Sequence, residues 1–502
     1  MSSPIGAGPD QAAPPTEEKD SRRWLALAII AISQLMVVLD ASIVNIALPS
    51  AQRDLGITDA DRQWVVTAYT LAFGGLLLLG GRIADYVGRK RMLIVGLLGF
   101  AGASALGGIA STAELLFAAR ALQGAFAALL APAALSLITV TFTEPKERAR
   151  AFGVFGAVSG GGAAIGLVVG GILTEYASWR WCLGVNVPIA IGAAVAAFLI
   201  VTESKAHGNT KYDVPGAVLV TAGLVSLVYG FTEAAKPELG WTAGTTVFFL
   251  VAAVVLLAAF VVWESRVANP LLPLRIALDR NRGGSYIVFL LVGAGLFGMF
   301  LFLAYYFQLN LGYSALKSGL ALLPFSAGII VGAGIISQIL PRVGPKPLMI
   351  PGLGLAVLGM LWLTQVTAET SYVTHVLPAE LLMSFGMAAV FIPASSTALV
   401  GVDEHDAGVA SALLNTSQQI GGSLGTALLN TLYTSAVAGY LASHVKAPAD
   451  VQRLTPDALI HGYHVAFLWA AVLLAAGLVA AIVFINAKKT DIPAEPAAAV
   501  AA

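Results

Sequence analysis

The chain has 502 residues, of which 58% are hydrophobic and 11% are charged, and its mean hydropathy is +0.83. These values lie far from those of soluble domains and indicate a membrane protein. Lys and Arg total 28, as do Asp and Glu, so no net charge favours nucleic acid. The single cysteine, Cys182, excludes an intramolecular disulfide and a cysteine-built metal site.

Apolar segments of roughly 20 residues, long enough to cross about 30 Å of hydrocarbon, recur along nearly the whole chain. We predict fourteen membrane-spanning helices, with the break "ASTAE" (110–114) separating the third from the fourth. An even number places both termini on one side of the membrane. The approximate limits are 24–47, 63–81, 92–111, 114–140, 151–174, 182–202, 214–233, 243–264, 284–309, 317–340, 347–366, 374–400, 408–436 and 464–486.

Lysine and arginine indicate the orientation, because short positively charged loops remain in the cytoplasm. With a cytoplasmic N-terminus, 20 of these residues fall on the cytoplasmic side and 7 on the outer side, while Arg120 lies within a span. We therefore expect both termini in the cytoplasm. The high Ala, Gly and Val content suggests a GC-rich bacterial genome, and hence a bacterial cell membrane.

The first and second halves of the chain are weakly similar. The loop "GRIADYVGRKRM" (81–92) is echoed by "SQILPRVGPKPL" (337–348), at an offset that also carries the first span onto the ninth. Internal repeats of this kind are common in transporters. We predict an all-α membrane protein with two six-helix bundles and two extra linker helices. Its parts are a disordered cytoplasmic tail (1–23), a six-helix bundle (24–202), the linker (203–283), a second six-helix bundle (284–486) and a cytoplasmic tail (487–502).

Two ionisable residues lie deep within predicted spans. Asp40 is about 12 Å from the outer end of the first span and Arg120 about 9 Å from that of the fourth, at 1.5 Å per residue. A charge at this depth is unfavourable unless it is paired or hydrated, so we expect the two to stabilise each other across a water-filled cavity and to couple protons. A static structural pair is the alternative. Asn45 and Gln123, on the same two spans, are candidates for the substrate cavity.

Four stretches carry a family resemblance. "LDASIVNIALP" (39–49) resembles the first-helix signature of the fourteen-helix drug:proton antiporter branch of the major facilitator superfamily. "GRIADYVGRKR" (81–91) resembles the superfamily's loop between helices 2 and 3, "LFAARALQGAFAA" (116–128) its fourth-helix arginine motif, and "SWRWCLGVNVPI" (178–189) this branch's entry to helix 6. The resemblance covers nearly the whole chain after the first tail and implies an exporter with two bundles that alternate in access.

The loop between the second and third spans contains Gly81, Asp85, Gly88, Arg89 and Lys90. The glycines permit tight turns and close helix approach, and Asp85 can accept hydrogen bonds from Arg89 or from N–H groups at a helix N-terminus. The resemblance implies a cytoplasmic latch that holds the bundles together in an outward-open state. The alternative is a loop whose positive charges only set topology.

The fifth span, "GAVSGGGAAIGLVVGGIL" (156–173), contains many glycines, which let helices touch backbone to backbone as a rocking interface requires. The antiporter family usually carries Gly-Pro before the final glycine pair of this helix. Here Gly166 is followed by Leu167, which puts the family's proline kink in doubt, although Gly170 and Gly171 remain. Simple tight packing is the alternative role.

Later spans add further candidates. Tyr306 and Gln308, near the end of the ninth span, fit a broad substrate pocket, although an interfacial aromatic belt is favoured for Tyr305 and Tyr306. Glu380 lies about 9 Å into the twelfth span. If the repeat holds, it occupies the opposite wall of the cavity of Asp40 as a second proton carrier; otherwise it reaches water at the outer end.

The thirteenth span places Asn415, Gln418 and Gln419 in the hydrocarbon region. Helical spacing puts Asn415 on one face with Gln418 or Gln419. These side chains are candidates for contact with the substrate, with hydrogen bonds between helices as the favoured role.

The sequence has no phosphate-binding loop, catalytic nucleophile motif or Cys/His cluster, so we expect neither an enzyme nor a metal site, and no cofactor beyond the proton gradient. We predict proton-coupled efflux of hydrophobic or cationic small molecules, including antibiotics, by a monomer in the lipid bilayer. The alternatives are proton-coupled uptake of a metabolite and a non-transporting membrane sensor.

Overall fold

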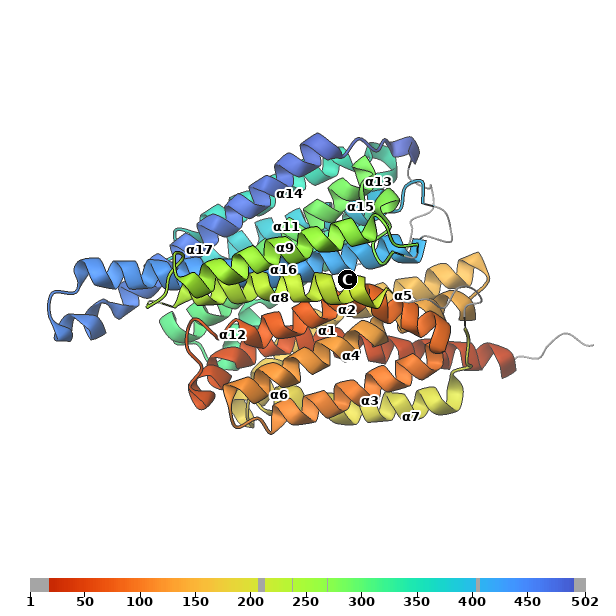
Figure 1. Cartoon of the computed structure of the whole chain (residues 1–502), viewed down its shortest axis with the longest axis horizontal. Coiled ribbons are helices and arrows are strands. Elements are labelled where there is room, and N and C mark those ends of the chain that lie inside the picture. Colours follow the sequence, from red (N-terminus) through yellow and green to blue (C-terminus); the bar gives the residue numbers. More distant parts are fainter. Residues whose placement is uncertain (1–17, 206–212, 237, 269, 403–406, 492–502) are drawn as a thin grey trace, which may run out of the picture.

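The computed structural model describes residues 18–205, 213–236, 238–268, 270–402 and 407–491, and its regular elements in these ranges are all helices. Thirteen helical segments of the described chain are long and apolar enough to cross a membrane. A further long helix, α16, contains more polar residues. The predicted all-helical fold of two bundles and an extra helix pair is confirmed (Figure 1).

The first bundle is formed by the N-terminal helices, in which α2 packs against α4, α3 against α4 and α1 against α5. Its α1 already begins within the predicted tail 1–23; residues 1–17 of that tail lie outside the described residues. The helices are α1 (Glu18–Leu55), α2 (Trp64–Val87), α3 (Arg89–Gly108), α4 (Ala113–Thr141), α5 (Pro145–Tyr176), α6 (Trp181–Gly184) and α7 (Asn186–Ile200).

The two extra helices, α8 (Val214–Ala235) and α9 (Gly244–Glu264), pack against each other, and α8 also packs against α2 and α16. The Gln63 amide donates to the Thr232 hydroxyl at 2.7 Å, and the Thr431 hydroxyl donates to the Phe231 carbonyl at 2.8 Å. The helix pair predicted as a linker is therefore docked on both bundles through α8.

In the second bundle, α11 packs against α16 and α17, and α14 packs against α15. Residues 492–502 of the predicted second tail lie outside the described residues. The elements are α10 (Leu274–Ala277), α11 (Arg280–Tyr305), the π-helical turn η1 (Tyr306–Asn310), α12 (Ala315–Ala321), α13 (Leu323–Val343), α14 (Lys346–Leu363), the π-helical turn η2 (Tyr372–Val376), α15 (Leu377–Ala398), α16 (Ala407–His444), α17 (Pro448–Phe484) and the 3₁₀ turn η3 (Lys489–Asp491).

Some predicted spans are not single helices. The segment 182–202 is divided into α6 and α7 shortly before Pro188, and 317–340 is divided into α12 and α13 shortly before Pro324. A proline lacks the backbone N–H and sterically disfavours a helical conformation in the preceding turn, which accounts for both interruptions.

The last two helices extend beyond the predicted spans. The apolar segments end near 436 and begin near 464, whereas α16 continues to His444 and α17 begins at Pro448. The 37 residues of α17 span roughly 55 Å, more than the hydrocarbon thickness. In Figure 1 the resulting hairpin projects past the other helices at the left. Hydropathy locates the part of a helix that lies in hydrocarbon, and these helices continue into polar sequence.

The two ends of the molecule are named here by the orientation that the sequence predicts. The predicted outer end contains the turn 56–63 between α1 and α2 and the turn 177–180 between α5 and α6. The predicted cytoplasmic end contains Gly88, between α2 and α3, and the start of α8.

Candidate functional site

Helix α1 carries an acidic residue, Asp40, on the face that packs into the first bundle. Asp40 is fully buried, and Val44 and Leu48, which follow at helical spacing on the same face, are buried as well. Ser33, two turns earlier on this face, is also buried, and its hydroxyl donates to the Ile29 carbonyl of its own helix. The Asp40 carboxylate therefore meets side chains from neighbouring helices.

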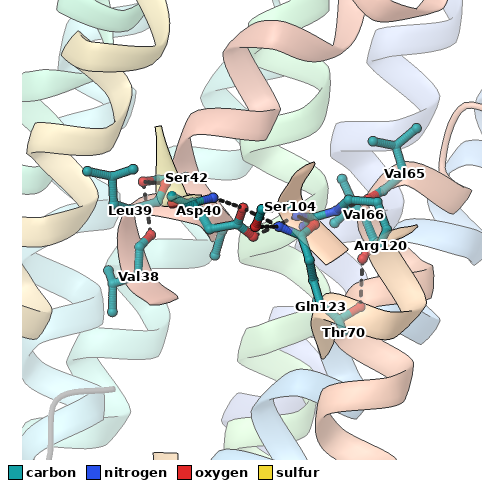
Figure 2. Close-up of polar contacts among 12 residues, drawn as sticks. Val38, Leu39, Asp40, Ser42, Val65, Val66, Thr70, Ser104, Arg120 and Gln123 are labelled. Atoms are coloured by element: carbon teal, nitrogen blue, oxygen red, sulfur yellow. Dashed lines mark hydrogen bonds and ion pairs between the residues drawn. The ribbon is translucent and has the colours of Figure 1, made fainter. Parts of the chain in front are cut away.

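Three side chains donate hydrogen bonds to Asp40, and two of them, Arg120 and Gln123, are labelled in Figure 2. Arg120 Nη1 of α4 lies 2.6 Å from Oδ2, and Oδ1 accepts from Gln123 Nε2 at 3.0 Å and from Asn186 Nδ2 at 2.8 Å. Charge-assisted bonds of this kind stabilise the ionised carboxylate. The sequence-based expectation that Arg120 pairs with Asp40 agrees with this geometry.

Arg120 is itself held on several sides. Its Nε donates to the Val65 carbonyl at 2.9 Å, its Nη1 also donates to Gln123 Oε1 at 2.8 Å, and its guanidinium lies 4.5 Å from the centre of the Tyr69 ring. The side chain is about 2% exposed. Removing either Asp40 or Arg120 would leave the other charge buried without a counter-charge. The stability of each side chain in the interior therefore depends on the other.

Two members of this network were not predicted. Asn186 opens α7, and Ser104 of α3 accepts a hydrogen bond from Gln123 Nε2 at 2.7 Å. Both are fully buried. Asn186 lies within the stretch "SWRWCLGVNVPI", and an amide at the start of a membrane helix is a usable signal. A lone serine in an apolar helix gives none.

A small cavity adjoins the network on its predicted outer side. It has a volume of about 10 Å³, room for about one water molecule. Trp179, one of its lining residues, donates from Nε1 to Asp54 at 3.0 Å. The cavity is lined by Val44, Ala47, Leu48, Ala51, Val65, Leu116, Arg120, Trp179, Cys182 and Leu183.

The surroundings of the pair differ from the prediction. We expected Asp40 and Arg120 to face a water-filled cavity shared by the two bundles, but every residue that bonds to them belongs to the first bundle. The physical reason is the helical period: the face of α1 that carries Asp40 is the face packed into its own bundle.

Glu380, the second predicted proton carrier, lies in the other bundle on α15. Its side chain is fully buried, so the alternative that it reaches bulk water is wrong. The Tyr372 hydroxyl donates to Oε2 at 3.2 Å, and Oε1 has no hydrogen-bond partner among the described residues. No contact between described residues joins Glu380 to Asp40 or Arg120, so the structure does not bring them to one cavity as predicted.

The aromatic residues after α11 are interior. Tyr305 and Tyr306 are at most 1% exposed, so the favoured interpretation as an interfacial belt is wrong. The Tyr306 hydroxyl donates to the Thr367 carbonyl at 2.7 Å, within the second bundle. Asn45, also a candidate for the substrate cavity, donates to the Ala41 carbonyl of its own helix at 3.1 Å.

The polar residues of α16 are divided between its neighbours. The backbone of Gln418 packs against Gly293 of α11, and Gln419 packs against Gly74 of α2, at the contact between the bundles. Oε1 of Gln419 is buried and has no partner among the described residues. Asn415 is half-buried. The favoured role of these residues, hydrogen bonding between helices, requires that they lie at helix contacts, and Gln418 and Gln419 do. No such hydrogen bond is seen among the described residues.

The sequence is similar to known membrane transporters. The family model of the Major Facilitator Superfamily matches residues 30–426, most of the chain. The chain belongs to the major facilitator superfamily. The predicted resemblance to its drug:proton antiporter branch is confirmed at the level of relatives, which are antibiotic resistance and export proteins.

Among these superfamily members, the puromycin resistance protein pur8 of Streptomyces alboniger is 50% identical over 96% of both chains. The cephamycin export protein CmcT of Amycolatopsis lactamdurans is 38% identical over 91% of this chain and 92% of its own. A bacterial homologue of the human lysosomal transporter Spinster, solved in an inward-facing and occupied conformation, superposes with a TM-score of 0.65 over 94% of this chain and 98% of its own. At 14% identity it shows the fold alone.

The predicted latch of this superfamily member makes its described polar contacts within the first bundle. Asp85 Oδ1 accepts from Arg89 Nε at 2.9 Å, and the two side chains form an ion pair, as anticipated. The N–H groups at the start of α3 donate to Glu203, which the sequence did not single out, at 3.1 Å from Lys90 and 3.3 Å from Arg91. Gly88 has a φ of 135°, a conformation that favours glycine, whereas Gly81 packs against Pro132.

The glycines of α5 lie at close helix contacts. A Cβ added at Gly166 would lie 1.9 Å from the Ser42 hydroxyl, and one at Gly170 would lie 2.8 Å from Ile43, both on α1. A Cβ at Gly171 would lie 2.6 Å from the Cα of Leu316 in the second bundle. Glycine therefore serves both packing within a bundle and contact between the bundles.

The transporter is closed at its predicted outer end. The Tyr305 hydroxyl donates to Gln52 Oε1 across the bundle interface, and Gln308 Nε2 donates to the Ile46 carbonyl at 3.0 Å. Gln308, predicted as a cavity residue, is thus part of this closure. These bonds join α1 of the first bundle to α11 and η1 of the second.

A buried arginine that the sequence analysis did not single out reinforces the closure. Arg62, before α2, is 1% exposed, and its guanidinium lies 4.1 Å from the centre of the Tyr305 ring and 4.7 Å from that of Tyr433. Its Nε donates to Asn430 Oδ1 at 2.9 Å. A cation between two aromatic rings of the other bundle must leave them before this end can open.

Proposed function

We propose that this superfamily transporter exports a hydrophobic or cationic antibiotic from a bacterial cell in exchange for protons, acting as a monomer with both termini in the cytoplasm. The main support is the buried network of Asp40, Arg120, Gln123 and Asn186 in a chain that is 50% identical to a puromycin resistance protein. The cephamycin export protein CmcT and the tetracenomycin C resistance and export protein of Streptomyces glaucescens are further relatives.

In the proposed cycle, a proton from the outer side reaches Asp40 through the small cavity beside Arg120. Protonation removes the charge that Arg120 compensates, and the amides of Gln123 and Asn186 still bond to the neutral group. Arg120 keeps its bonds to Val65 and Gln123. The network can therefore exist in two protonation states with different attraction between α1 and α4, which is what coupling of a proton to a helix movement requires.

A transport assay tests the role of Asp40. In proteoliposomes with an imposed pH gradient, Asp40→Asn should abolish drug transport driven by the gradient while the purified protein stays folded, because the amide cannot exchange a proton. Glu238→Gln, at an exposed acid, is the matched control and should transport normally. Undiminished coupled transport by Asp40→Asn would remove this residue from the mechanism.

A panel of compounds tests substrate and direction. In a host without its own pumps, expression should raise the inhibitory concentration of at least one antibiotic and lower its accumulation, with puromycin as the first compound tried. Increased accumulation of every responsive compound would instead indicate an uptake symporter. No response together with no proton movement would favour the non-transporting sensor.

A further inference from the structure

Two carboxyl groups that the proposed export function does not use are buried together at the predicted cytoplasmic end of the extra helix pair. Asp213 immediately precedes α8 and is 5% exposed, and Glu264 ends α9 and is 3% exposed. Acids so far from water are rare unless they are paired. Their surroundings therefore need an explanation.

One oxygen of each carboxyl group is satisfied by N–H donors. Asp213 Oδ1 accepts from the backbone of Gly216 at 2.9 Å and from Trp263 Nε1 at 2.7 Å. Glu264 Oε2 accepts from the backbone of Leu272 at 2.9 Å. These bonds tie the start of α8 and the segment before α10 to the end of α9.

The other two oxygens converge on each other. Asp213 Oδ2 and Glu264 Oε1 are buried and have no partner among the described residues when both groups are taken as ionised. A Cβ built at Gly216 would lie 2.5 Å from the first oxygen and 2.6 Å from the second, so the two atoms approach one point. The two carboxyl groups are within hydrogen-bonding reach of each other if one of them carries a proton.

The described surroundings of the pair contain no compensating cation; residues 206–212, directly before Asp213, lie outside the described residues. Neither acid forms an ion pair between described residues; Arg266, two residues after Glu264, is exposed. On the helices packed against α8, Arg82 of α2 forms no described bond to either acid, and α16 contains no carboxylate, lysine or arginine between 407 and 443. Two adjacent carboxylates buried without a nearby cation repel each other strongly, and a proton shared between them removes this repulsion.

We propose that Asp213 and Glu264 form a one-proton binding site, separate from Asp40, that joins the start of α8 to the end of α9. With the proton bound, one carboxyl group donates a hydrogen bond to the other and holds the start of α8 against the end of α9. When the proton leaves, two buried negative charges repel each other, and the contact between the start of α8 and the end of α9 weakens. Because α8 packs against α2 and α16, the state of this site reaches both bundles.

Hydrogen–deuterium exchange compared between variants at the same pH tests the proposal, since intrinsic exchange rates then cancel. Glu264→Gln retains a donor toward Asp213 but cannot lose a proton. At acidic pH the first-turn amides of α8 and the amide of Leu272 should exchange equally in both proteins. As pH rises, the wild-type rate should increase relative to the variant by up to about tenfold per pH unit, as expected for release of one proton.

The matched control is Glu233→Gln on α8, the helix whose first turn is measured. Glu233 is similarly buried, at 6% exposed, but it has a cation partner in Lys236 at 2.5 Å. Its exchange at the start of α8 should follow the wild type at every pH. A ratio between wild type and Glu264→Gln that does not change with pH would overturn the proposal.

An infrared measurement gives an independent readout. A pH jump on the wild-type protein should remove the carbonyl band of one protonated carboxyl group that Glu264→Gln and Asp213→Asn both lack. Persistence of the same band change in both variants would also overturn the proposal. Because neither readout involves drug transport, failure here is distinguishable from failure of the proposed export function.

Discussion

At the residue scale, the buried carboxyl group of Asp40 is accommodated by three side-chain hydrogen-bond donors. Arg120, Gln123 and Asn186 approach its two oxygens from two helices of the same bundle. A buried carboxylate satisfied in this way is stable in the interior, and its stability depends on every partner.

Arg120→Ala should therefore destabilise the protein by about 3–5 kcal/mol if Asp40 stays ionised, because a buried carboxylate would lose its cation. Arg120→Lys should lie between alanine and wild type, since an ammonium cannot reproduce the fixed fork of bonds to Val65, Gln123 and Asp40. Thermal unfolding of the purified protein in detergent measures both.

Arg53→Ala, at an exposed arginine of α1, is the control and should change the melting temperature little. Equal melting temperatures for Arg120→Ala and Arg53→Ala would contradict the view that Arg120 compensates a buried charge.

At the element scale, the network is positioned by the close crossing of α2 and α4. A Cβ added at Gly124 would lie 2.2 Å from the Tyr69 carbonyl, and one at Gly80 would lie 2.1 Å from the Ala128 carbonyl. The two backbones are therefore in contact. This proximity lets Arg120 of α4 reach the Val65 carbonyl of α2.

Gly124→Ala should force α4 away from α2, lower the free energy of unfolding by about 1–3 kcal/mol through overpacking, and weaken coupled transport. Gly102→Ala on α3 has open space around the new methyl group and should be neutral, or stabilising by up to about 1 kcal/mol. Melting temperatures and transport rates of the two variants check this pair. Equal behaviour would show that the crossing tolerates separation.

At the scale of the whole molecule, the two bundles are held together at the predicted outer end. The contacts of Gln52 with Tyr305, of Ile46 with Gln308 and of Arg62 with its aromatic neighbours all lie there. Export requires this end to open. The stability of the closure then sets how often the outward-open state is populated.

Arg62→Ala should favour the outward-open state, because it removes a buried cation from between Tyr305 and Tyr433. A cysteine placed at Ala315, buried at the contact of α12 with α5, reports opening in a Cys182→Ala background. Its labelling by an impermeant maleimide should become roughly tenfold faster, equivalent to about 1.4 kcal/mol.

Arg180→Ala is the matched control for this measurement. Arg180 lies at the same end, but it bonds to Asp54 and to the Ala110 carbonyl within the first bundle. Removing it should leave labelling at position 315 unchanged. An equal increase in both variants would show that Arg62 does not act as a closure between the bundles.

Sequence alone determined the membrane class, the approximate helices and the pairing of Asp40 with Arg120. Length and hydropathy follow directly from the requirement that hydrocarbon be crossed by apolar helices with satisfied backbone groups. Similarly, two opposite charges at similar depth in membrane helices have few possible partners other than each other.

Only the tertiary structure decided what surrounds those residues. Which way Asp40 faces, the contributions of Asn186 and Ser104, the interior position of Tyr305 and the separation of Glu380 from Asp40 depend on how helices rotate and pack. The same applies to the convergence of Asp213 and Glu264, which are 51 residues apart in the chain. Hydropathy fixes a residue's depth in the membrane, whereas the partner it meets is set by side-chain packing between helices distant in sequence.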